Sequence, residues 1–224
     1  MMSNLFSIFD TNTNSLIELN WMSSLLNLSM MPYSFWLYQS KLFMLIFKIY
    51  MILFNEFKNI LNTKFNFLNS IYLISIFFFI FINNIMGLFP YIFTSSSHMI
   101  FSISMSFPLW ISLMLFGWMN NTNFMFSHMI PSGTPMILMP FMVLIETISN
   151  IIRPGTLTIR LTANMIAGHL LLTLLSQSAS SPIIMISMMI IIIQMILLIL
   201  EFSVSIIQSY VFSILLTLYT KETN

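Results

Sequence analysis

The C-terminal part of the chain holds two long apolar stretches, about 136–176 and 182–219, which the short segment SQSASSP joins. Each stretch could form about 38–40 helical residues, or about 57–60 Å of helix at 1.5 Å per residue. Because the hydrocarbon core of a bilayer is about 30 Å thick, helices of this length must tilt strongly, bend or leave the membrane. The short connection predicts an antiparallel hairpin. Its first helix has bend points at Pro140, Pro154 and Gly155.

Charge is too scarce for a water-soluble fold. The chain of 224 residues is 58% hydrophobic and 6% charged, whereas soluble domains carry about 25% charged residues. We therefore predict an all-α polytopic membrane protein, a single membrane domain over residues 1–224. It should have about five transmembrane helices plus one interfacial amphipathic helix. The expected spans are 16–38, 69–92, 98–118, 136–176 and 182–219, and a polar loop is expected at 119–135.

The interfacial helix is predicted at residues 39–66, where lysines punctuate an apolar run. This segment carries four of the seven basic residues. The positive-inside rule places it on the cytoplasm-like side, which is the matrix side in a mitochondrion. Counting crossings from there puts the N-terminus outside and the C-terminus on the cytoplasm-like side, which would be the matrix if the membrane is mitochondrial.

Several classes of protein are excluded by what the sequence lacks. There is no cysteine, and His98, His128 and His169 are far apart, so we expect no metal site and no cofactor. The net charge of +1 gives no support to a nucleic-acid partner. The sequence contains neither a nucleophile–base constellation nor a phosphate loop, so a soluble-type hydrolase is excluded.

The predicted hairpin nevertheless contains ionisable residues, which in lipid are functional candidates because burying a charge there is costly. Uncharged polar residues accompany them. The ionisable set is Glu146, Arg153, Arg160, His169 and Glu201, and the polar set is Asn150, Thr156, Asn164, Gln194, Ser205 and Gln208.

Helical spacing sorts the residues of the first hairpin helix into faces. Glu146, Arg153 and Arg160 are seven apart, so an unbroken helix places them within about 40° of one another. Asn164 lies one turn past Arg160 on the same face, whereas His169 lies on the opposite face. On the last helix, a stripe is shared by Glu201, Ser205 and Gln208.

Structural roles compete with functional ones at most of these positions. Glu146 and Arg153 could form an ion pair near the interface, and His169 could be a packing histidine. Asn164 and Gln208 could be hydrogen-bonding links between helices. Arg160 fits a structural role less well, because no acidic residue lies within two turns on its own helix.

The chemistry of these side chains suggests a proton path interrupted by a fixed charge. Arginine keeps its proton at any relevant pH, so it cannot relay protons. It can lower the pKa of a carboxylate that approaches it and so force proton release. Histidine and glutamate can both relay protons near neutrality in suitable surroundings.

One run of the sequence is specific enough to suggest a family. The run RLTANMIAGH at 160–169, followed by Glu201 and Gln208, resembles subunit a of the F-type ATP synthases in its mitochondrial, insect-type form. The runs at 83–98, 137–157 and 206–219 resemble it too. The resemblance covers nearly the whole chain and is weakest in residues 39–70.

The resemblance implies a role for each matched position. Arg160 would be the essential arginine that faces the rotor ring of c subunits. His169 and Glu201 would line the half-channel on the intermembrane side, and Glu146 would lie on the matrix half-channel. The remaining candidates are polar neighbours of this set, namely Asn164, Gln208, Arg153, Thr156 and Ser205.

The resemblance also implies a place and partners. The chain would be a proton-translocating stator subunit of the F0 sector in the mitochondrial inner membrane. It would not itself be an enzyme, because ATP chemistry belongs to the F1 sector. Its partners would be the c-subunit ring, subunit b, a subunit of the subunit 8 type, the lipid bilayer and, indirectly, F1.

Two readings from other classes stay open on the residues alone. A membrane subunit of a respiratory proton pump would place lysines and carboxylates in several spans, whereas here they concentrate in the final hairpin. A purely structural anchor would tolerate replacement of Arg160. A voltage sensor is disfavoured, because the two arginines lie in one helix.

Overall fold

The structure of the chain, a computed structural model, describes residues 6, 9–12, 18–32, 34, 36–61, 67–89, 91–130, 135–179 and 184–223. All regular elements within these residues are helices, which confirms the predicted all-α class. They are η2 (Leu19–Trp21), α1 (Met22–Leu26), η3 (Asn27–Met30), α2 (Lys41–Leu61), α3 (Phe67–Gly87), η5 (Ser95–Ser97), α4 (Met99–Asn120), α5 (Thr122–His128), η6 (Met136–Leu138), α6 (Met139–Ser178) and α7 (Ile184–Thr223).

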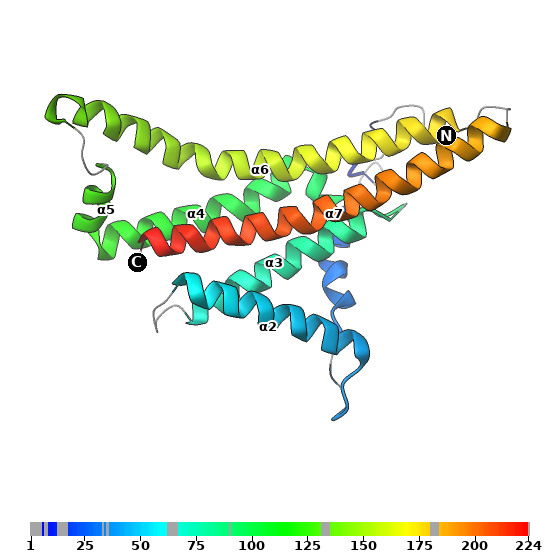
Figure 1. The fold of residues 1–224 in the computed structure, drawn as a ribbon, viewed down its shortest axis with the longest axis horizontal. Coiled ribbons are helices and arrows are strands. Elements are labelled where there is room, and N and C mark those ends of the chain that lie inside the picture. The colour runs from blue at the N-terminus through cyan, green and yellow to red at the C-terminus, as the bar shows by residue number, and fades with distance from the viewer. Residues whose placement is uncertain are drawn as a thin grey trace.

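The last two helices form the predicted hairpin and dominate the molecule. Each is 40 residues long, which corresponds to about 60 Å. Long runs of Leu, Ile and Met favour a helix because every backbone polar group is then satisfied within its own segment. α6 continues through Pro154 and is bowed along its length (Figure 1).

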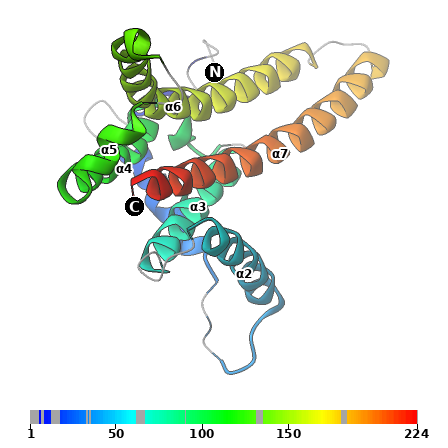
Figure 2. The same cartoon turned by 60° about the vertical axis from the view of Figure 1, so that its left-hand side comes forward.

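The remaining long helices stack against this hairpin. α4 packs on α6, α3 packs on α7, and α2 packs on both α3 and α7. Figures 1 and 2 both show α2 on the side of α3 that lies away from α6. The core lies between α2, α3 and α7, where Phe57, Leu73 and Ile80 are almost completely buried.

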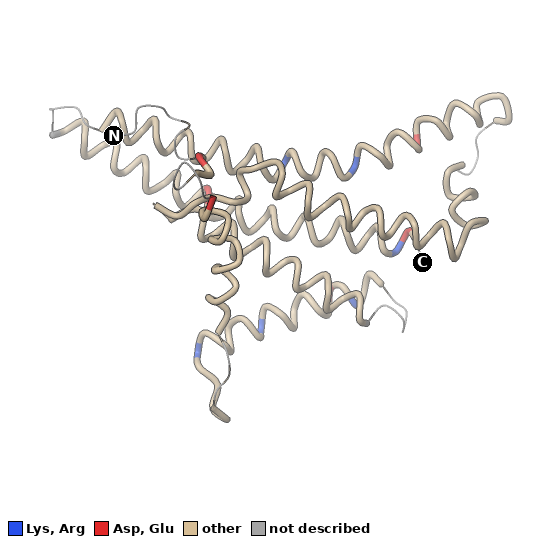
Figure 3. The backbone as a smooth tube through the Cα atoms, turned by 180° about the vertical axis from the view of Figure 1, so that it is seen from behind, with Lys and Arg blue, Asp and Glu red and all other residues tan. Residues whose placement is uncertain are grey.

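Four helices within the described residues are long and apolar enough to cross a membrane, namely Leu68–Gly87, Met99–Asn120, Met136–Ser178 and Met185–Thr223. Charged residues are sparse along all of them (Figure 3). The helix expected at the interface is present as α2, whose side chains Leu53, Phe57 and Leu61 are buried against the bundle.

Two sequence expectations differ from the structure. The span predicted over 16–38 is not one long helix, because η2, α1 and η3 end at Met30 and Pro32 follows; residues 13–17 fall outside the described part. The polar loop predicted over 119–135 contains the short helix α5. Met125 of α5 is buried against Gly117 of α4, and this apolar contact holds the turn.

Candidate functional site

Arg160 lies near the middle of α6 and its side chain is exposed on the surface of the isolated chain. Its guanidinium makes no hydrogen bond or ion pair with any other residue that the structure describes. Asn164 is also exposed, one turn further along. A permanent cation in an apolar region requires an anionic or polar partner, so this surface suits a carboxylate brought by another chain.

Gln208 is the predicted neighbour that the structure does bring to Arg160. The two side chains line one shallow cavity between α6 and α7, together with Leu157, Leu161, Val211 and Phe212. The hydroxyl groups of Thr156 and Ser205 each donate a hydrogen bond within their own helix. The Thr156 hydroxyl donates to the Arg153 carbonyl at 2.9 Å, and the Ser205 hydroxyl donates to the Phe202 carbonyl at 2.7 Å.

Glu201 of α7 is buried against α6, with 8% of its surface exposed. Glycine at position 168 permits this approach, because a Cβ there would lie 2.8 Å from both Cδ and Oε1 of Glu201. Neither carboxylate oxygen has a hydrogen-bond partner among the described residues. A buried carboxyl with such surroundings needs water or a proton to satisfy it.

His169 follows Gly168 and lies half-buried at a large cavity. We call this the turn-end cavity, since it lies toward the end where α6 finishes and α7 begins. Its empty volume is about 1910 Å³, open space at the mouth included. The Nε2 atom of His169 is buried and has no partner in the described part of the chain. The structure thus brings the predicted pair His169 and Glu201 to neighbouring positions on α6 and α7.

Glu146 is engaged in an ionic network rather than free. The Arg153 guanidinium donates to Glu146 Oε1 at 3.4 Å and to Glu222 Oε2 at 3.3 Å. Arg153 also lies over the ring of Tyr219, 5.7 Å from its centroid. The Glu146–Arg153 ion pair that the sequence left open therefore exists within α6, and the second pair, Arg153–Glu222, links α6 to the last turn of α7.

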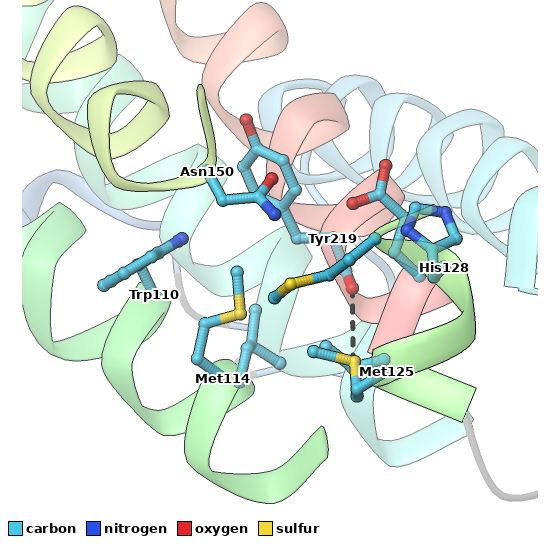
Figure 4. Close-up of a pocket in the computed structure, with 10 residues that line it drawn as sticks. Trp110, Met114, Met125, His128, Asn150 and Tyr219 are labelled. Atoms are coloured by element: carbon cyan, nitrogen blue, oxygen red, sulfur yellow. Dashed lines mark hydrogen bonds between the residues drawn. The ribbon is translucent and has the colours of Figure 1, made fainter. Parts of the chain in front are cut away.

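A second cavity lies at the opposite end of the hairpin, where α6 begins and α7 ends. This open-end cavity has an empty volume of about 410 Å³. Asn150, Tyr219, Glu222 and His128 contribute its polar lining. Figure 4 shows Asn150 and Tyr219 facing Trp110 and Met114 of α4, with His128 and Met125 of α5 closing the far side.

Three residues of these sites escaped sequence reasoning. Glu222 pairs with Arg153 across 69 positions, and Tyr219 and Asp10 line the two cavities. Their contacts depend on the register of α6 against α7 and on how the N-terminal segment folds back. The sequence feature that could have pointed to these three residues is that they are charged or polar and lie near the ends of an apolar chain.

Comparison with known proteins identifies the family of the chain. Residues 19–221 match the family described as ATP synthase A chain. The chain belongs to this family. It is 56% identical to ATP synthase subunit a of Locusta migratoria over 223 residues, which is 99% of each chain. It is 52% identical to the subunit a of Anopheles quadrimaculatus and 51% identical to that of Drosophila melanogaster, in both cases over the full length of both proteins.

Membership of the ATP synthase A chain family establishes the general function. The chain is a proton-translocating membrane subunit of the F0 sector and takes part in ATP synthesis. It is not the catalytic part of that complex, whose ATP chemistry lies in F1. This excludes the respiratory-pump reading.

Proposed function

We propose that this subunit forms two offset aqueous half-channels that load and unload protons on the carboxylates of a rotating c-subunit ring. The observation that carries the proposal is the placement of the two cavities at opposite ends of the α6–α7 hairpin, with the exposed Arg160 between them. A continuous channel would leak protons, whereas two separate ones force each proton to travel with the ring.

Loading takes place from the turn-end cavity. A proton reaches His169 and Glu201, whose buried polar atoms have no hydrogen-bond partner among the described residues and can therefore take up a proton and pass it on. It then neutralises a ring carboxylate. The neutral site can move through lipid, because a carboxyl without charge avoids most of the cost of burial.

Unloading takes place beside Arg160. As a protonated ring site returns to the hairpin, the fixed positive charge favours its ionised form and drives proton release. The released proton leaves through the open-end cavity, near Glu146 and its partner Arg153. Each charge that crosses contributes about 2.3 kcal/mol per 100 mV of membrane potential.

The ring would cover the face of α6 that carries Arg160. Ala163 and Ala167 are exposed on this part of α6, and small side chains allow another helix to approach closely. The complex would lie in the mitochondrial inner membrane, with the N-terminus in the intermembrane space and the C-terminus in the matrix. Subunit b and a subunit of the subunit 8 type would complete the stator.

The decisive experiment replaces Arg160 with glutamine in the assembled complex. Because Gln fills similar space without charge, we expect the complex to assemble on a native gel while proton-coupled ATP synthesis is lost. Exposed Lys221→Gln serves as the control, since it removes a basic charge outside the proposed path. Normal synthesis by the Arg160 variant would favour the structural-anchor reading.

A further inference from the structure

The turn-end cavity is lined by three parts of the chain that are distant in sequence. α6 and α7 provide His169, Thr173 and Gln194, and the segment after α3 provides Tyr91 and Ile92. The N-terminal segment provides Asp10, Asn12 and Asn20. The cavity therefore has a polar wall that does not belong to the hairpin, and this wall includes a carboxylate.

Asp10 is held at this wall by backbone and neighbouring contacts, and its carboxylate makes no hydrogen bond or ion pair with any other residue that the structure describes. The Asn20 side chain donates from Nδ2 to the backbone carbonyl of Asp10 at 3.1 Å. The ring of Phe9 meets the His169 imidazole edge to face, with centroids 6.4 Å apart. The backbone at residues 9–10 is thus fixed beside His169, while the Asp10 side chain is exposed.

The rate at which protons reach such a cavity from solution is limited by diffusion. A single site that captures protons at the diffusion limit of about 10¹⁰ M⁻¹s⁻¹ receives on the order of 10³ protons per second at pH 7. An exposed anion at the mouth of a cleft with low-dielectric walls raises the local cation concentration and the capture rate, by about 10-fold or more. Asp10 is the carboxylate among the described residues that line this cavity, and the other titratable lining groups are Tyr91 and His169.

We propose that Asp10 is a proton-collecting residue at the mouth of the turn-end cavity. Its carboxylate takes a proton from the bulk solution, becomes a neutral acid, and returns to the anion as the proton passes across the cavity toward His169. No bond other than O–H and N–H is made or broken, so the step needs no co-reactant. This inference rests on the proposed half-channel function and extends it to a residue outside the hairpin.

Buffer dependence tests the proposal with the whole ATP synthase reconstituted in liposomes, the N-terminal side of this chain being exposed to the medium. We expect Asp10→Asn to lower the rate of potential-driven ATP synthesis about threefold or more at very low buffer concentration. A small weak acid such as MES at about 20 mM should restore the rate, because mobile buffer replaces the lost collector. Asp10→Glu should retain the wild-type rate at both buffer concentrations.

The control is Glu18→Gln, which removes another exposed carboxylate of the N-terminal segment that does not line the cavity. It should behave as wild type at both buffer concentrations. An Asp10→Asn rate that is unchanged at low buffer, or that is lowered equally at both concentrations, would overturn the proposal. Failure of the half-channel function itself would be recognised separately, because Arg160→Gln would then still support synthesis.

Discussion

Gly168 is the residue at which α6 and α7 come close enough to bury a carboxylate. The space that a Cβ would need is filled by the end of the Glu201 side chain, at 2.8 Å. Because that side chain is flexible, Gly168→Ala should displace the carboxylate without unfolding the hairpin. We expect normal assembly with proton flux through F0 lowered several-fold, measured in reconstituted vesicles.

Gly155→Ala is the matched control, since it adds the same methyl group to the same helix at a position where a Cβ would have no atom of another described segment within 4 Å. It should leave proton flux unchanged, and it replaces a residue with poor helix propensity by a better one, a gain of about 0.5–1 kcal/mol. Equal flux in the two alanine variants would mean that the position of Glu201 does not matter to transport.

The contacts of Arg153 indicate a role for this residue that the sequence alone left open. It bonds to Glu146 on its own helix and to Glu222 on the next, while stacking on Tyr219. These groups are about one-third exposed, so each pair contributes at most about 1 kcal/mol. Their more important effect is to fix the Glu146 carboxylate beside the open-end cavity, where the proposed release takes place.

Among the elements, α2 packs on the hairpin through an apolar interface that also contains a hydrogen bond between Tyr210 and Glu56. The Tyr210 hydroxyl of α7 donates to Glu56 Oε2 of α2 at 3.0 Å. Tyr210→Phe should weaken the docking of α2 by about 1–2 kcal/mol, because it removes a hydrogen bond to a charged group. Hydrogen exchange of the α2 amides in the intact complex would measure this as faster exchange.

Comparison with two other substitutions makes that result specific. Glu56→Gln combined with Tyr210→Phe should add little to the single change, because once the Tyr210 hydroxyl is gone the residue at position 56 has lost its donor whether or not it is charged. Phe57→Ala should loosen α2 more strongly, by about 3–5 kcal/mol, since Phe57 is completely buried. If α2 exchange is unaltered by Tyr210→Phe, the apolar interface alone holds this helix.

The elements also show what hydropathy can and cannot predict. The bounds of α6 and α7 agree with the sequence prediction to within four residues, because a long apolar run has no alternative to a helix in lipid. The expected span at 16–38 was not obtained as one helix, since Asn20, Asn27 and Pro32 interrupt its pattern. The pairing of Arg153 with Glu222 depends on the register between two helices, which the sequence of either helix does not contain.

For the whole molecule, the arrangement places one cavity toward each end of the α6–α7 hairpin, and Arg160 lies between the two. The turn-end cavity holds Asp10 and His169, and the open-end cavity holds Asn150 and Glu222. The helices α6 and α7 connect these two ends, since residues of both helices line both cavities. A chain arranged in this way should expose one cavity to each side of the membrane.

Cysteine labelling tests this arrangement without background from the chain, which has no cysteine of its own. Thr173→Cys in the turn-end cavity should react with a membrane-impermeant thiosulfonate added on the intermembrane side, and Asn150→Cys in the open-end cavity should react from the matrix side. Leu171→Cys, two residues from Thr173 but on an exposed apolar face, should stay unmodified, because a thiolate does not form in lipid. Mass spectrometry of this subunit gives the extent of modification. Reaction of both cavity cysteines from one side would contradict two separate half-channels, since both cavities would then open to the same solution.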